Sequence, residues 1–192
     1  DIEVIGLEEA AAIFDLADVG RAAARFDYQK LAHLNGIWLR RADDDRLTRL
    51  VLERLARRTE GAVGAITAGR IAKLMPGLKE RARTLEDLTD SAAFLARTVP
   101  LPMEPRAEAL LTPQARIALR ELARSWNGVA WEPDALEAAT RAYAEANALK
   151  LKDLAMPLRA ALTGSTTSPP VFDVAVALGQ EETLARIAAV SG

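Results

Sequence analysis

The stretch Thr112-Pro113-Gln-Ala-Arg-Ile-Ala-Leu-Arg-Glu-Leu-Ala-Arg-Ser-Trp126 indicates most directly which kind of fold this sequence adopts. Threonine is a preferred N-cap residue, and proline suits the first helical position, where its missing N–H would have had no partner. The apolar side chains that follow are spaced as on one face of a helix, and they are Ala115, Ala118, Leu119, Leu122 and Trp126. The stretch therefore predicts a capped helix that buries one side.

Similar patterns extend in both directions from this helix. Alanine supplies 39 of the 192 residues, and with Leu, Arg and Glu it gives high helix propensity almost everywhere. We therefore expect an all-α protein. One expected helix is capped by Asp27 and has Tyr28, Leu31, Leu34 and Trp38 on its apolar face. The other expected helices cover about 7–16, Asp43 through Leu55, a segment ending near Pro76, Thr84 through Phe94, and then 133–148, 153–162 and 181–189.

Two segments outside these helices carry information about organisation. Residues 100–105 read Pro-Leu-Pro-Met-Glu-Pro, and three prolines in six residues exclude regular helix, which makes this segment the best domain boundary. Residues 171–176 are the one stretch whose side chains are compatible with a β-strand, but no neighbouring segment offers a partner strand. Pro157 is tolerable only near the start of its helix.

Side chains that carry enzyme chemistry are scarce. The sequence has no Cys and a single His, His33, which excludes Cys-based metal sites and thiol catalysis and leaves too few ligands for a usual zinc site or triad. The paired acids Glu8/Glu9, Asp43 to Asp45 and Glu181/Glu182 lie at expected helix starts, where they complement the helix dipole. No glycine-rich phosphate loop and no apolar run of membrane-spanning length is found. We expect no catalytic residue, no metal and no cofactor in this segment, and no membrane association.

The charges become informative when they are divided along the chain. The net charge is −2, but residues 40–83 carry 12 basic and 6 acidic side chains, a local net of +6. Arginine makes bidentate contacts to phosphate and stacks on bases. The candidate phosphate contacts are Arg54, Arg57, Arg70 and Lys73, and the alternative is a solvated helix face.

The helix after Thr112 also has the arginine spacing of a DNA-binding helix-turn-helix. Arg116, Arg120 and Arg124 repeat every four residues. The helix that follows, however, is acidic, rich in alanine and poor in base-reading side chains. We therefore expect an ordinary amphipathic helix and no DNA partner.

Three segments together are similar to bacterial glutamyl-tRNA synthetases, which are class I enzymes. Phe26-Asp-Tyr-Gln-Lys-Leu-Ala-His-Leu-Asn-Gly-Ile-Trp-Leu-Arg40 resembles that family's Lys-Leu-x-x-Leu-Asn-Gly-x-Tyr-Ile-Arg. Residues 74–88, with Leu-Lys-Glu-Arg-Ala-Arg-Thr-Leu in their middle, resemble its Leu-x-x-Arg-x-Lys-Thr-Leu region. Pro157-Leu-Arg-Ala-Ala-Leu-Thr-Gly164, Ser168-Pro-Pro-Val-Phe172 and Leu178-Gly-Gln-Glu resemble its C-terminal signature. Order and spacing match over nearly the full length.

The resemblance implies the anticodon-binding portion of such an enzyme, with two consecutive helical bundles. The chain begins at Asp1 and has no His-Ile-Gly-His or Lys-Met-Ser-Lys-Ser signature, so we expect a C-terminal portion that is inactive alone. The implied domains are 1–46, the end of the stem-contact region, and the anticodon-binding subdomains 47–104 and 105–192. ATP, Mg²⁺ and glutamate would bind in the missing half of the parent ligase. The implied partner is the anticodon loop of glutamate tRNA, and the implied protein is cytoplasmic and monomeric. The alternative is a helical protein-interaction or regulatory module without RNA binding.

The family's anticodon contacts can be carried over residue by residue. An arginine at the position of Arg81 or, as second choice, Arg83 would distinguish the third anticodon base. Arg159, Ser168, Pro169 and Val171 match further anticodon contacts; Val171 replaces the usual Leu. Each has a plainer alternative: Arg81 or Arg83 pairs with a neighbouring Glu, Arg159 caps a helix C-terminus, and Ser168 is an N-cap. Likewise, the plainer alternative for Asn35-Gly36 is a tight helix exit.

Overall fold

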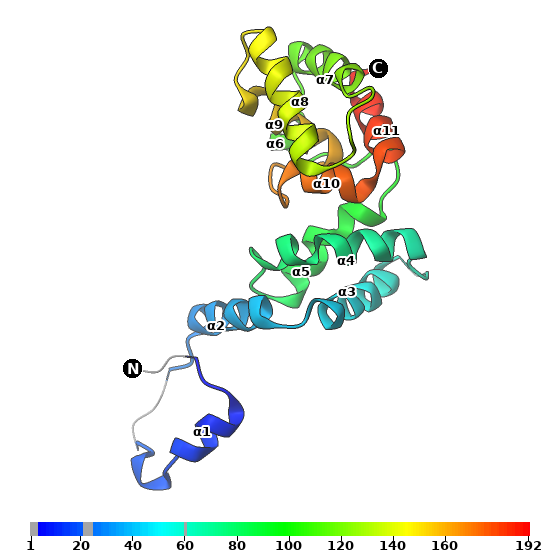
Figure 1. Cartoon of the computed structure of the whole chain (residues 1–192). Coiled ribbons are helices and arrows are strands. Elements are labelled where there is room, and N and C mark those ends of the chain that lie inside the picture. The colour runs from blue at the N-terminus through cyan, green and yellow to red at the C-terminus, as the bar shows by residue number, and fades with distance from the viewer. Residues whose placement is uncertain (1–3, 21–24, 60) are drawn as a thin grey trace.

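A computed structural model describes residues 4–20, 25–59 and 61–192, and within these residues it is built of helices joined by turns and loops (Figure 1). The fold is all-α, as the sequence predicts. The helices are α1 Leu7–Ile13, η1 Leu16–Asp18, α2 Tyr28–Arg41, α3 Asp44–Arg58, α4 Ala65–Lys79, α5 Leu85–Ala92, η2 Ala93–Ala96, α6 Pro105–Glu108, α7 Pro113–Ser125, α8 Pro133–Ala146, α9 Leu151–Thr163, α10 Val171–Leu178 and α11 Gln180–Ser191.

Side-chain caps begin four of the main helices where the sequence predicts them. The Asp27 carboxylate accepts hydrogen bonds from the backbone N–H groups at 29 and 30, and Asp43 accepts from the N–H at 46. Thr84 and Asp87 form a reciprocal capping box, and the Thr112 hydroxyl accepts from the N–H at 115. Each cap satisfies backbone donors that a helix start otherwise leaves without partners.

Two expectations about helix bounds and proline position are wrong. The helix expected to end near Pro76 continues through it to Lys79, and Pro157 lies in the middle of α9 rather than near its start. Buried leucines lie on both sides of each proline, so packing holds the neighbouring turns in place. Residues 171–176, for which no partner strand was expected, lie in helix α10, and the buried residues of this helix are Val171, Phe172, Val174, Ala175 and Leu178.

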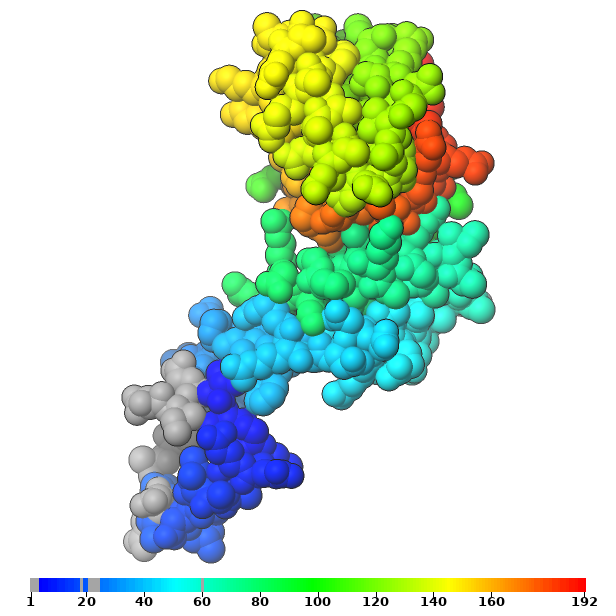
Figure 2. All heavy atoms as spheres, in the orientation of Figure 1, coloured from blue at the N-terminus to red at the C-terminus, as the bar shows by residue number. Residues whose placement is uncertain are grey.

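The expected apolar face of α2 is also wrong. Tyr28, Leu31 and Trp38 are exposed by 77, 49 and 44%, whereas the buried residues of this helix are Gly36 and Leu39. Helix α2 therefore contacts the rest of the fold through a narrow side next to glycine. Figure 2 shows the described segment with α1 and η1 as a lobe that projects away from the remaining helices.

The helices from α3 onward gather into two groups. Helices α3, α4, α5 and η2 contact one another, and helices α7 to α11 form the second group (Figure 1). The two groups meet where α4 contacts α10. At the centre of the second group, the indole N–H of the buried Trp126 donates to the Thr140 hydroxyl at 3.2 Å.

A fully buried arginine connects the second group with the segment that leaves η2. Arg186 is 0% exposed and donates to the carbonyl oxygens of Leu162, at 2.6 Å, and Arg97, at 2.9 Å. It also pairs with Glu182 at 2.7 Å. Burial is the main cause that lowers the pKa of this guanidinium, and the pair with Glu182 opposes it. Arg186 therefore joins α9, α11 and the connection from the first group.

Candidate nucleic-acid interface

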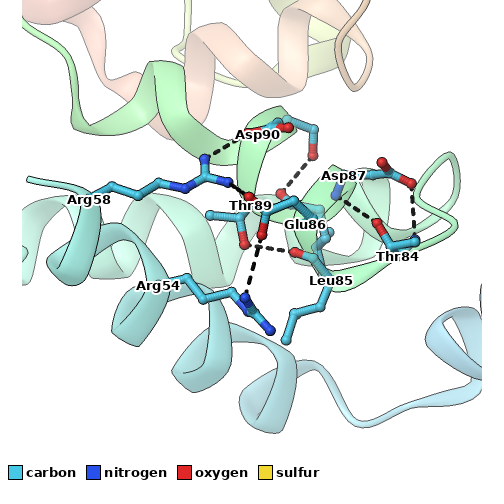
Figure 3. A network of polar contacts seen from close by, with 10 residues as sticks. Arg54, Arg58, Thr84, Leu85, Glu86, Asp87, Thr89 and Asp90 are labelled. Carbon is cyan, nitrogen blue, oxygen red and sulfur yellow. Dashed lines mark hydrogen bonds and ion pairs between the residues drawn. The ribbon is translucent and has the colours of Figure 1, made fainter.

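The turn between α4 and α5 presents Arg81 and Arg83 to solvent. Both residues are exposed. The turn ends at a rigid anchor, because the Asp87 carboxylate accepts from the N–H groups of Arg83 and Thr84 at 3.1 and 3.0 Å. Figure 3 shows this capping box at the start of α5. The backbone of the turn is thus held by hydrogen bonds while its two arginine side chains point outward.

Helix α2 holds the same turn from the other side. The Asn35 amide donates to the Arg83 carbonyl oxygen at 2.6 Å. A Cβ added at Gly36 would lie 3.3 Å from the Ala82 carbonyl oxygen and 3.5 Å from the Arg83 Cα. The alternative that Asn35-Gly36 is a helix exit is therefore wrong. The two residues lie inside α2, where glycine allows the turn to approach closely.

Lys79, the last residue of α4, adds a third support to this turn. Its ammonium group pairs with Asp44 at 2.6 Å and donates to the Ala42 carbonyl oxygen at 3.0 Å. The start of the turn is thereby attached to the junction of α2 and α3.

Arg159 and Ser168 meet in the second group of helices. The Arg159 Nε donates to the Ser168 hydroxyl at 3.0 Å, and that hydroxyl donates to the Pro169 carbonyl oxygen at 2.7 Å. The N-cap of α10 is Pro170, without a side-chain bond, so Ser168 is not an N-cap and that alternative is wrong. Instead, Ser168 orients the Arg159 guanidinium.

Arg81 and Arg159 are electrostatic neighbours although they come from different groups of helices. Partial burial lowers the pKa of Arg159, and the positive charge of Arg81 lowers it further. Like charges repel one another, and an anion that binds both guanidinium groups would relieve that repulsion. The sequence predicted both arginines, and the fold brings them together.

Pro169 and Val171 lie at the start of α10, and both are buried. Val171 is only 4% exposed and belongs to the hydrophobic core. Pro169 packs on α4, since a Cβ added at Gly77 would lie 3.0 Å from its Cβ. Helix α10 therefore places these residues at the junction of the two groups.

The candidate phosphate contacts have different surroundings. Arg54 pairs with Glu86 at 3.4 Å, and Arg58 next to it on α3 pairs with Glu86 and Asp90 (Figure 3). Hydrogen bonds to Asp90 and Glu86 raise the pKa of Arg58. The remaining three candidates are Arg57 and Lys73, both exposed, and Arg70, whose guanidinium donates to the Leu178 carbonyl oxygen at 2.8 Å.

Sequence reasoning assigned no binding role to the residues that support this interface. Gly77 lies next to the helix end expected near Pro76, whereas the structure has it inside α4, in contact with Pro169 of the second group. No signal in the sequence pointed to Gly36, because most of the apolar side chains expected to pack lie on the exposed side of α2. Within the described ranges, no group of three or more His, Asp or Glu side chains could hold a metal ion, and no helix is long and apolar enough to cross a membrane.

Comparisons with known proteins agree with this arrangement. The family described as anticodon binding domain matches residues 46–191. The chain is 51% identical over 192 residues to glutamate–tRNA ligase 1 of Gluconacetobacter diazotrophicus, covering all of this chain and 41% of the relative. Glutamate–tRNA ligase 1 of Acidiphilium cryptum gives the same identity and coverage. The chain therefore spans about two fifths of the length of these curated relatives.

Solved structures support the same fold. A glutamate tRNA ligase from Elizabethkingia meningosepticum superimposes with a TM-score of 0.82 at 24% identity, covering 97% of this chain and 36% of that one. At this identity the likeness concerns the fold alone. The family match and the curated relatives support RNA recognition over the alternative of a protein-interaction module. With its helical fold and the match over residues 46–191, this chain belongs to the anticodon binding domain family, and the curated relatives it matches are glutamate–tRNA ligases.

Proposed function

We propose that this chain binds the anticodon loop of a glutamate tRNA and distinguishes its third anticodon base. Arg81 reads that base, with Arg83 as second choice, and Arg159, Ser168, Pro169 and Val171 form the rest of the site. The observation that carries the proposal is the ordered turn that presents Arg81 and Arg83 to solvent, held by Asn35 and Asp87, with Arg159 as an electrostatic neighbour of Arg81. Arginine recognises unstacked bases and phosphates through its fork of donors. Arg81 offers these donors at an exposed turn, and Ser168 orients those of Arg159.

In this proposal, Arg54, Arg57, Arg70 and Lys73 contact phosphates and set the position of the RNA. Phosphate contacts carry no sequence information by themselves, whereas base contacts do. Residues 47–104 and 105–192 are proposed as the two anticodon-binding subdomains, and residues 1–46 as the end of the stem-contact region. The exposed apolar side chains of α1 and α2 agree with a position next to other parts of a ligase.

The parent protein is proposed to be a cytoplasmic, monomeric ligase that joins glutamate to its tRNA with ATP and Mg²⁺. The part of the chain that the structure describes offers neither a metal-binding cluster nor a phosphate loop, so it does not fit ATP or Mg²⁺. We place both in the portion of the relatives that this chain does not cover.

The direct test is a titration of the 192-residue chain with two labelled tRNA transcripts that differ only at the third anticodon base. The wild-type protein is expected to prefer the glutamate anticodon. Arg81→Ala should reduce this preference by about 1 to 3 kcal/mol, the usual value of one base contact. Lys73→Ala should instead weaken both complexes equally and lower the slope of log K against log salt by about 1. Equal affinity of the wild-type protein for both transcripts would refute the proposed function.

Arg83→Ala decides between the two arginines of the turn. If Arg81→Ala leaves the preference intact and Arg83→Ala removes it, the reading role passes to the second choice. If both variants keep the wild-type preference, the turn does not read the anticodon.

A further inference from the structure

Helices α4 and α10 meet through two separate contacts. At one contact, Arg70 of α4 donates from Nη2 to the carbonyl oxygen of Leu178, the last residue of α10, at 2.8 Å. At the other, Gly77 of α4 faces Pro169 and Pro170, which directly precede α10. Figure 1 shows α10 as the element of the second group that lies against α4.

The spacing of these contacts fixes an orientation as well as a distance. Seven residues separate Arg70 from Gly77, and a helix rises about 10.5 Å over seven residues. Their partners lie at opposite ends of α10, so the two helices run antiparallel. A pair of helices held at both ends resists tilting more than a pair held at one point.

Gly77 leaves no room for a larger residue at its contact. A Cβ at this position would lie 3.0 Å from the Pro169 Cβ, 3.5 Å from its Cγ and 3.8 Å from the Pro170 Cδ. The proline ring has no rotamer through which to move away, and the Ser168 hydroxyl bonds to the Pro169 carbonyl oxygen at 2.7 Å. An ordinary contact begins near 3.4 Å, so the backbones would have to separate by about 0.4 Å or more.

Both halves of the proposed reading site begin next to this contact. Arg81 follows Gly77 by four residues, about one helical turn. On the other side, Ser168 precedes Pro169 and bonds to the guanidinium of Arg159. Any separation of Gly77 from Pro169 therefore moves Arg81 and Arg159 apart.

We propose that Gly77 and Arg70 are positioning residues that set the separation of Arg81 and Arg159 by holding α4 against α10. This inference rests on the proposed anticodon function and deepens it. It also gives Arg70 a role other than phosphate contact, since one of its guanidinium nitrogens donates a hydrogen bond to the Leu178 carbonyl oxygen.

The first experiment compares Gly77→Ala with Gly69→Ala in the 192-residue chain. Both glycines lie in α4, and a Cβ at Gly69 would meet nothing within 4 Å. Both variants gain the same helix propensity, so they differ only in the contact with Pro169. With the two tRNA transcripts described above, Gly77→Ala should lose at least about fivefold of the anticodon preference, whereas Gly69→Ala should keep it.

The second experiment compares Arg70→Met with Lys73→Met, which also lies in α4. Each variant removes one positive charge and keeps a long side chain. If Arg70 is a positioning residue, Arg70→Met should lower the anticodon preference at least about fivefold. Lys73→Met should weaken both complexes equally and lower the salt slope, with the preference unchanged. If both variants change the salt slope and keep the anticodon preference, Arg70 is a phosphate contact and the positioning role is overturned.

The outcomes separate the two proposals. A wild-type protein without anticodon preference refutes the proposed function and this inference with it. A wild-type protein that discriminates, with Gly77→Ala within twofold of Gly69→Ala, overturns the positioning role of Gly77 and leaves the proposed function standing. The helical content of each variant is measured by circular dichroism. If Gly77→Ala has lost its helical signal, the comparison of Arg70→Met with Lys73→Met tests the positioning role instead.

Discussion

Replacing Arg186 by methionine tests how much one buried guanidinium contributes to stability. The side chain is 0% exposed and makes three hydrogen bonds, to Glu182 and to the carbonyl oxygens of Leu162 and Arg97. Methionine fills a similar volume but leaves two carbonyl oxygens and a carboxylate without their donor.

The magnitude follows from these partners. A buried acceptor left without a donor costs about 1–3 kcal/mol, and removing one partner of a buried ion pair costs about 3–5 kcal/mol in all. The desolvation of the guanidinium, which lowers its pKa, is relieved at the same time and offsets part of the loss. We therefore expect Arg186→Met to lower the free energy of unfolding by about 3 kcal/mol.

The assay is urea unfolding followed by tryptophan fluorescence and by circular dichroism. Arg141→Met is the matched control, because Arg141 also pairs with a glutamate four residues earlier at 2.7 Å, but its side chain is 54% exposed. An exposed pair of this kind contributes about 0.3–0.5 kcal/mol. Equal losses in the two variants would refute the reasoning, since burial would then have no effect on the strength of the pair.

Two further changes address the turn that carries Arg81. Thr84→Ala removes the side-chain half of the capping box, and we expect the free energy of unfolding in urea to fall by about 1 kcal/mol. An unchanged free energy of unfolding would contradict this expectation. Gly36→Ala places a Cβ 3.3 Å from the Ala82 carbonyl oxygen, so the turn must move, and the titration with two tRNA transcripts should show a reduced anticodon preference. Gly69→Ala is again the control, and an unchanged preference in Gly36→Ala would show that the turn is held by other contacts.

Local signals in the sequence determined most of the secondary structure. The caps at Asp27, Asp43, Thr84 and Thr112 are bonds between residues two or three apart, so they are present in the sequence before any tertiary contact forms. The all-α class followed from these caps, from apolar periodicity and from helix propensity.

Predictions failed where packing outweighs local preference. The prolines inside α4 and α9 lack a backbone donor, yet both helices continue because buried side chains on either side hold the neighbouring turns. The apolar residues of α2 lie mostly on its exposed side, because the close approach at Gly36, rather than hydrophobicity, selects which side packs.

The candidate site likewise depends partly on local sequence and partly on tertiary packing. The sequence by itself identified the candidate residues, because Arg81, Arg159 and Ser168 lie in segments that resemble one family. Only the tertiary structure decided that Arg81 and Arg159 are neighbours, that Ser168 orients Arg159 and that Gly77 seats α4 on Pro169. The physical reason is distance along the chain: 78 residues separate Arg81 from Arg159, and only the packing of α4 against α10 brings them together.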